Sequence, residues 1–349
     1  MRKIWRGLRG EPEGSGLGAV TPVRSLPGSF DVGTVALSAD GRYGLCGGGD
    51  GPVRLWDLTT GSLLRELGTD GAGGAGLWTC GRRVVACGGG WFNAWNTSLL
   101  GWEGRLDTRP PAGRRGEPVL HTGASDRRGA VTFSADGRFA LGICDDNALR
   151  MWDLAGPVFV PTLRGPGVRI PPVQTLQGHG AYPTAVWLSA DGQRAVSAGS
   201  DGKIRVWNVA GGTALSIPHP DGWVSSVCLS GDGRLVLAAG DHGGRTLWLL
   251  DATTGALVRA FEAARGRSPR RSEDLSAEVP VARLTSDGRF AITGENDGRI
   301  RIWATSTGRC VRTLEGHTDE VRAIALTPDD RFLLSGSSDG TVRQWQVGR

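Results

Sequence analysis

The sequence predicts an all-β protein, a seven-bladed β-propeller built from four-stranded antiparallel blades. Short apolar runs alternate with turn residues, one type of turn recurs at intervals, and a tryptophan ends the third run of most repeats. Glycine accounts for 57 of the 349 residues and shows no Gly-x-y period. An excess of glycine spread in this way is typical of many tight turns between many short strands.

A hairpin turn follows the first strand of each repeat. Asp-Gly between two apolar stretches favours a tight antiparallel reversal, because these residues accept the positive φ angles that such a turn requires. The turns read SADGR at 38–42 and 134–138, SADGQ at 189–193, SGDGR at 230–234, TSDGR at 285–289 and TPDDR at 327–331.

The third strand of a repeat contains a large apolar anchor and precedes another turn and a short fourth strand. It reads VRLWD at 53–57, LRMWD at 149–153, IRVWN at 204–208, IRIWA at 300–304 and VRQWQ at 342–346. The anchors are Trp56, Trp95, Trp152, Trp207, Leu250, Trp303 and Trp345. This long pattern resembles the WD-repeat family over roughly residues 21–349. The resemblance implies a closed ring, for which seven is the commonest number of blades.

Two repeats depart from the pattern. The second, at 68–106, has no Asp-Gly hairpin, and its strand lacks the expected aspartate before Trp95. The fifth has Leu250 in the tryptophan position, with Trp248 two residues earlier and so on the same face of the strand. We expect both blades to form, but less rigidly than the others.

The two ends of the chain predict how the ring closes. The last repeat stops at Val347, after its third strand, and TPVRSLPG at 21–28 matches CVRTLEG at 310–316. We therefore expect Val23–Leu26 to supply the outer strand of the last blade, which removes an exposed sheet edge. The predicted organisation is an N-terminal tail at 1–20 and one propeller at 21–349.

The resemblance also implies buried hydrogen-bond tetrads of His, Ser or Thr, Asp and Trp, because a buried indole N–H needs an acceptor. The sixth repeat keeps Thr293, Asp297 and Trp303 without a histidine, while Cys46 and Gly142 occupy the hydroxyl position of the first and third. We expect stability to be concentrated around the fourth and seventh blades. The complete tetrads are His179, Ser197, Asp201 and Trp207, and His317, Ser335, Asp339 and Trp345.

No catalytic residue, metal ligand or cofactor is predicted, so we expect a protein that is not an enzyme. His121, His219 and His242 lack the spacing of metal ligands. GSSDG at 336–340 matches the GxSxG motif around Ser338, but that motif needs a strand–turn–helix context, whereas a hairpin is expected here. Residues 71–76 fit GxGxxG without a following helix.

Cysteine usage and apolar runs bear on the compartment. The six cysteines form no CxxC pair and fall mostly in apolar runs, which favours reduced thiols in the cytoplasm. The N-terminus lacks the apolar segment of a signal peptide, and no run of apolar residues is long enough to span a membrane. Only Lys3 and Lys203 are lysines among the 40 basic residues, a skew typical of a GC-rich, hence bacterial, genome. We expect a monomeric cytoplasmic scaffold that works in signalling.

The resemblance implies that a protein or peptide docks on the loops at one end of the ring, the top face. Exposed aromatic residues tend to anchor interfaces, although packing against a neighbouring loop is an equal alternative for each of them. We expect Trp223→Ala to weaken partner binding without lowering stability much. The transferred contact positions are Trp223, Tyr182, Arg127, Asp145, Ser200, Asp241, Asn296, Glu320 and Arg322, with Asp31, Thr184, Ser225 and Ser338 beside them.

The alternative function is binding of nucleic acid or anionic lipid through arginine-rich loops between blades. Acidic residues near the last of these loops reduce its positive electrostatic potential. No aromatic side chains are interleaved with the arginines to stack on bases, so binding of nucleic acid is the weaker expectation. Ser268 in the same stretch is a candidate phosphate acceptor. The arginines concerned are Arg114, Arg115, Arg265, Arg267, Arg270 and Arg271.

Overall fold

The structure is a computed structural model. It describes residues 20–28, 31–38, 40–48, 51–67, 76–80, 83–88, 91–96, 101–107, 131–134, 138–143, 146–153, 172–219, 222, 224–240, 246–262 and 281–347.

The described elements are β-strands of three to eight residues, which is the length expected between closely spaced turns. They are β1 (Val20–Pro27), β2 (Thr34–Leu37), β3 (Tyr43–Gly47), β4 (Val53–Asp57), β5 (Ser62–Leu67), β6 (Gly76–Cys80), β7 (Arg83–Gly88), β8 (Trp91–Asn96), β9 (Gly101–Asp107), β10 (Val131–Phe133), β11 (Phe139–Ile143), β12 (Leu149–Asp153), β13 (Gln174–Leu176), β14 (Pro183–Leu188), β15 (Arg194–Gly199), β16 (Lys203–Asn208), β17 (Thr213–Pro218), β18 (Val224–Leu229), β19 (Leu235–Gly240), β20 (Thr246–Asp251), β21 (Leu257–Glu262), β22 (Val281–Leu284), β23 (Phe290–Gly294), β24 (Ile300–Ala304), β25 (Arg309–Leu314), β26 (Val321–Leu326), β27 (Phe332–Ser337) and β28 (Thr341–Val347).

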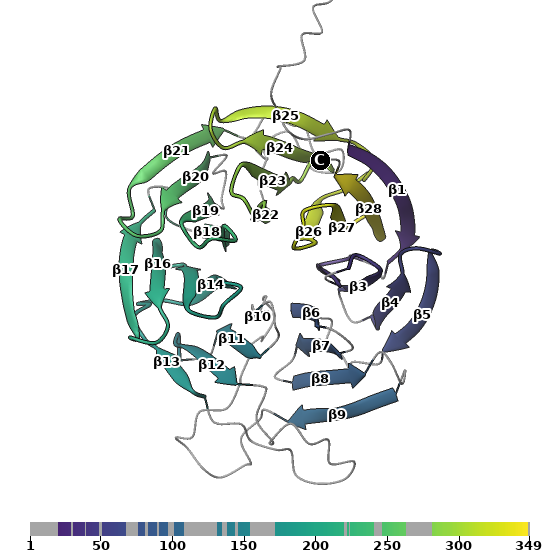
Figure 1. Ribbon diagram of the computed structural model, residues 1–349, viewed down its shortest axis with the longest axis horizontal. Helices are drawn as coiled ribbons and strands as arrows, with labels where there is room; N and C mark the ends of the chain where they lie inside the picture. Colours follow the sequence, from purple (N-terminus) through teal and green to yellow (C-terminus); the bar gives the residue numbers. More distant parts are fainter. Residues whose placement is uncertain are drawn as a thin grey trace, which may run out of the picture.

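The described strands pair into seven four-stranded antiparallel sheets, which we call blades 1 to 7. Blade 1 is β2–β5, blade 2 is β6–β9, and so on to blade 6, β22–β25; blade 7 is β26, β27, β28 and β1. The first strand of each blade contacts the first strand of the next, from β2 and β6 around to β26 and β2. Figure 1 shows these strands around the centre of a closed ring. The prediction of an all-β propeller with four-stranded antiparallel blades is confirmed, and the sheets are as many as the anchors read from the sequence.

Pairing of β1 with β28 joins the two ends of the chain. The register runs from Val20 opposite Val347 to Pro27 opposite Thr341. The expected strand Val23–Leu26 is therefore the middle of a longer strand, and the purple β1 lies beside the yellow β28 in Figure 1. The pairing covers the edge that β28 would otherwise expose and gives the last blade its fourth strand.

The hairpin motif has a side-chain explanation. In the first blade the Ser38 hydroxyl donates to the Asp40 carboxylate over 2.6 Å, and the Arg42 amide donates to the same oxygen over 3.0 Å. Gly41 completes the turn at φ 70°, a region that favours glycine. The same Ser- or Thr-to-Asp bond recurs in blades 4, 5, 6 and 7, so the motif fixes each turn locally.

The anchors form the core between neighbouring blades. Trp56, Trp152, Trp207, Trp303 and Trp345 are all buried. In blade 5 Leu250 lies opposite Val236 and is buried in the core shared with blade 4, so it fills the anchor position, as expected, and the blade forms. Blade 2 also forms all four of its strands without an Asp-Gly hairpin.

Candidate partner-binding face

The tetrads hold the loops of the top face to the body of blades 4 and 7. In blade 7 the Trp345 indole donates to the Ser335 hydroxyl over 2.9 Å, and that hydroxyl lies 2.8 Å from His317 Nε2. His317 Nδ1 lies 3.0 Å from Asp339 Oδ2. The chain of contacts thus runs from the core to the turn between the second and third strands, through a histidine whose side chain is fully buried.

Asp339 collects several donors at the end of this chain. Burial alone would raise the pKa of its carboxyl, but hydrogen bonds from His317, Thr341 and the Thr318 amide outweigh it and hold that pKa well below its ordinary value. The carboxylate is therefore ionised at neutral pH, and it links its own turn, through the Thr341 amide, to the loop between β25 and β26, through the Thr318 amide.

Blade 4 contains the same chain with an added cation. His179 lies 2.7 Å from the Ser197 hydroxyl, which accepts from the Trp207 indole over 2.9 Å. Arg205 Nη1 lies 2.7 Å from His179 Nδ1 and donates to Asp201 over 2.8 Å. Burial and the Arg205 charge together lower the pKa of His179, so this imidazole is neutral at pH 7.

Sequence reasoning missed this arginine, although a signal was present. Arginine precedes the tryptophan anchor by two residues in five repeats, as in RLW, RMW, RVW, RIW and RQW. In blades 3, 4 and 6 it pairs with the aspartate four residues earlier in the turn. The arginines at this position are Arg54, Arg150, Arg205, Arg301 and Arg343.

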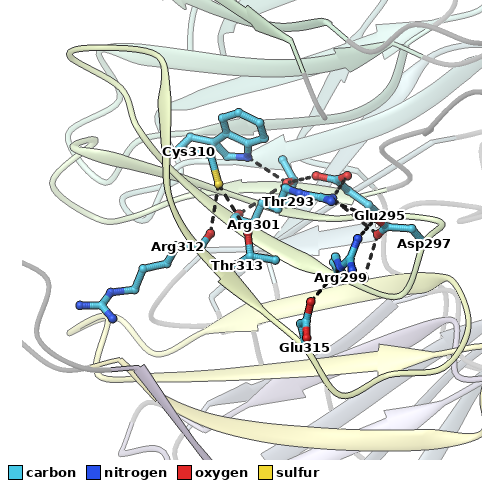
Figure 2. A network of polar contacts seen from close by, with 10 residues as sticks. Thr293, Glu295, Asp297, Arg299, Arg301, Cys310, Arg312, Thr313 and Glu315 are labelled. Carbon is cyan, nitrogen blue, oxygen red and sulfur yellow. Dashed lines mark hydrogen bonds and ion pairs between the residues drawn. The ribbon is translucent and has the colours of Figure 1, made fainter. Parts of the chain in front are cut away.

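Blade 6 replaces the histidine with an acid. The Trp303 indole donates to the Thr293 hydroxyl over 3.0 Å, and that hydroxyl donates to Glu295 over 3.1 Å. Arg301 binds Glu295 and, over 2.9 Å, Asp297. Figure 2 shows how these side chains converge. Burial is the main cause that raises the pKa of Glu295, to about 7. The nearby Asp297 charge adds to this increase, and the Arg301 charge reduces it.

Blades 1, 3 and 5 have incomplete tetrads. The indole N–H of Trp56 faces the weakly accepting sulfur of Cys46, and neither it nor that of Trp152 makes a hydrogen bond among the described residues. The cause is that Cys46 and Gly142 replace the Ser or Thr whose hydroxyl accepts the indole N–H in the complete tetrads. In blade 5 the buried His219, which the sequence left without a role, packs on Trp248 with ring centroids 5.4 Å apart.

Four of the expected top-face residues form one polar cluster where blade 7 meets blade 1. Arg322 donates to Asp31 over 2.9 Å and to Glu320 over 3.1 Å. The Ser338 hydroxyl donates to the other Asp31 oxygen over 2.9 Å. The side chains of Arg322 and Asp31 are 32% and 33% exposed, so the cluster is both ordered and reachable. We call these four residues the junction cluster.

Blade 4 presents a second set of the expected residues. The carbonyl of Tyr182 accepts from the amide and the hydroxyl of the exposed Ser200, over 2.9 and 3.0 Å. The Tyr182 side chain is partly buried against the core of blades 3 and 4, which favours the packing alternative for this aromatic. Thr184 donates to the Val224 carbonyl of blade 5, so it links blades. Asn296 of blade 6 is partly exposed.

The remaining sequence predictions fall outside the described residues. They are Trp223, Arg127, Asp145 and Asp241 of the top face, the arginine-rich loops and Ser268.

The described residues contain no group of three or more His, Cys, Asp or Glu side chains placed to hold a metal ion. Ser338 lies in the turn between β27 and β28 and belongs to the junction cluster, so it is not on a strand–turn–helix elbow. The part of the chain that the structure describes includes no helix with the length and hydropathy of a membrane span.

Comparison with known proteins gives a family match over more than half of the chain. The WD domain, G-beta repeat matches residues 20–57, 170–208, 213–245, 277–304 and 308–346. Two rice proteins, from Oryza sativa subsp. japonica, are similar over shorter stretches. The small ribosomal subunit protein RACK1y is 28% identical over 52% of this chain, and the small ribosomal subunit protein RACK1z is 30% identical over 37% of it. The chain spans about a third of the length of these curated relatives.

Proposed function

The chain belongs to the WD-repeat family, and on that premise we propose that it is a non-catalytic scaffold that docks a protein or peptide on the top face of its propeller. The observation that supports this proposal most directly is the junction cluster. It gathers charged side chains from two blades at the loop end of the ring and holds them in one arrangement through three hydrogen bonds.

The charges of the cluster define the partner. Two carboxylates surround one guanidinium, and Asp319 lies next to Glu320 in the same loop, so the surface carries an excess of negative charge. Complementary charge steers association and selects partners. We therefore propose that the partner contributes a lysine or arginine side chain to this junction.

We also propose that the scaffold acts as a monomer in the cytoplasm of a bacterium, in signalling. Cys46, Cys228 and Cys310 are free thiols, as a reducing compartment would keep them. The arginine-rich loops lie outside the described residues, so no contact favours the nucleic-acid or lipid alternative.

The test compares a charge reversal in the cluster with a matched reversal elsewhere. Glu320→Lys places a second basic group beside Arg322, whereas Glu66→Lys reverses a half-exposed carboxylate on the outer strand β5. Tagged parent, Glu320→Lys and Glu66→Lys proteins are used for quantitative affinity purification, and each captured protein is then titrated against the purified variants.

We expect at least one captured protein to bind Glu320→Lys roughly tenfold more weakly than the parent or Glu66→Lys, because a like charge now faces its basic side chain. Equal binding of every captured protein to all three would contradict docking at this junction. Captured proteins or lipids whose binding falls steeply with salt but ignores Glu320→Lys would instead support the arginine-rich loops.

A further inference from the structure

The innermost strands of the blades form a ring around the propeller axis (Figure 1). In the six described blades whose first hairpin begins with Ser or Thr, one layer of this ring is the residue two positions before that Ser or Thr, and a single one of these six residues is charged. These residues hold equivalent places in the register of the first and second strands. Among the described blades they are Ala36, Thr132, Trp187, Cys228, Arg283 and Ala325.

Arg283, from blade 6, reaches past blade 5 to blade 4. Its guanidinium carbon lies 4.8 Å from the centroid of the Trp187 ring, which belongs to β14. The intervening blade 5 contributes Cys228, a buried thiol close enough for Arg283 to affect its pKa. On the opposite side of Arg283 the next two blades place only Ala325 and Ala36 in this layer.

This guanidinium has no carboxylate partner among the described residues. Within the described part of the chain its one hydrogen bond runs from Nη1 to the Ala282 carbonyl over 2.9 Å, and the one titratable group that affects its pKa is the Cys228 thiol, which burial keeps neutral. A guanidinium carries five N–H donors, so most of them are left for another group. Arg283 is half-buried, and its burial lowers its pKa, yet an arginine keeps its charge at neutral pH.

Two arginines on the third strands of blades 6 and 4 provide a contrast. Arg301 of blade 6 and Arg205 of blade 4 are buried, and each is matched with at least one carboxylate within 3 Å. A partly desolvated cation without a counter-ion is costly. The cation–π contact with Trp187 restrains the Arg283 guanidinium, and a guanidinium held beside an aromatic ring can bind an oxyanion with two parallel hydrogen bonds.

We propose that Arg283 forms an anion site on the axis of the propeller, which binds the phosphate or carboxylate group of a small ligand. The site is separate from the junction cluster, because its charge is positive and its residues come from the inner strands of blades 4, 5 and 6. It therefore does not depend on the proposed docking of a basic partner.

The test measures the melting temperature at constant ionic strength while chloride is replaced by phosphate or by acetate. Parent protein is compared with Arg283→Gln and with the control Arg289→Gln. Arg289 is on the same blade and also lies over an aromatic ring, Phe290, but is exposed at a hairpin turn.

We expect the melting temperature of the parent and of Arg289→Gln to rise to a plateau with one of the two anions, and the anion that gives the plateau identifies the ligand group. Arg283→Gln should show no such rise, and in chloride alone it should melt at or above the parent temperature because an unmatched cation has been removed. Arg283→Lys keeps the charge but loses the bidentate geometry, so its dissociation constant should increase roughly tenfold.

The proposal is overturned if the parent shows no saturable rise with either anion, or if Arg283→Gln shows the same rise as the parent. If Arg283→Gln does not fold, Arg283→Lys decides the matter in the same assay: unchanged affinity would mean that Arg283 does not bind the anion.

Discussion

Replacing Asp339 by alanine tests whether the tetrads stabilise the ring. The carboxylate accepts from His317 Nδ1 over 3.0 Å, from the Thr318 amide over 3.0 Å, and from the Thr341 amide and hydroxyl over 2.8 and 2.6 Å. The alanine variant leaves all of these donors without their acceptor. Water can reach Thr341, which is partly exposed, but the His317 side chain is fully buried.

The expected loss follows from these contacts. An unsatisfied buried donor costs about 1–3 kcal/mol, and loss of a charge-assisted hydrogen bond adds about 1.5 kcal/mol or more. We therefore expect Asp339→Ala to lower the free energy of unfolding by about 3 kcal/mol, in the range for a broken buried network. The matched control is Asp146→Ala, at the same turn position of blade 3, where the aspartate side chain is 49% exposed and, among the residues that the structure describes, bonds Arg150 and the Ala148 amide alone.

The assay is urea unfolding at pH 7, followed by tryptophan fluorescence, with the midpoint and slope compared between variants. Asp146→Ala should cost about 1 kcal/mol or less, as is typical of an exposed ion pair. If Asp339→Ala and Asp146→Ala lowered stability equally, the buried histidine would contribute nothing, and the reasoning about tetrads would be refuted.

Three further predictions concern other departures among the repeats. Cys46→Ser gives the buried Trp56 indole an acceptor and should raise stability by about 1 kcal/mol in urea melts; no gain would refute this. Asp330 of blade 7, at φ 56°, accepts from the Ser286 amide and hydroxyl of the preceding blade 6, so a double-mutant cycle of Asp330→Ala and Ser286→Ala should give a coupling of about 1 kcal/mol, and additivity would refute the link. The Glu295 carboxyl has a pKa of about 7 in the folded protein and an ordinary value of 4.5, so between these pH values the folded state binds a proton that the unfolded state has lost. The stability of the parent should therefore fall as the pH rises from about 4.5 to 7, and Glu295→Gln should reduce this fall when thermal melts are measured across that range.

The repeat made much of the fold predictable. In five blades the hairpin turn is fixed by a bond from Ser or Thr to Asp, and each anchor whose side chain the structure describes is a large apolar residue buried between blades. Because both features recur along the sequence, they predict the blades and their order. Closure of the ring was predictable because the last repeat lacks a fourth strand and a segment near the N-terminus resembles the fourth strand of the repeat before it. The pairing of β1 with β28 confirms this prediction. The absence of a hydroxyl at Cys46 and Gly142 likewise explains why the indole N–H groups of Trp56 and Trp152 make no hydrogen bond among the described residues.

The junction cluster was predictable only in part. The sequence placed Asp31, Glu320, Arg322 and Ser338 among the top-face positions, but the contacts of Arg322 and Ser338 with Asp31 join residues nearly a whole chain length apart. Asp31 adopts φ 62°, a conformation in which asparagine and aspartate are enriched among residues other than glycine, but the repeat pattern does not assign it to this position. The pairing arises from closure of the ring, which brings loops of the first and last blades together.

The axis of the propeller is where a repeat pattern says least about function. The tryptophan anchors recur because each fills a similar space between blades, whereas the equivalent positions of the layer that contains Arg283 hold side chains of very different size, among them Trp187, Cys228 and alanines. A residue there contacts side chains from blades that are not its neighbours, as Arg283 does with Trp187. Arg283 is the one charged residue at these positions in the blades whose side chains the structure describes, and because no repeated packing role accounts for it, it indicates ligand chemistry better than a residue of the repeated core does.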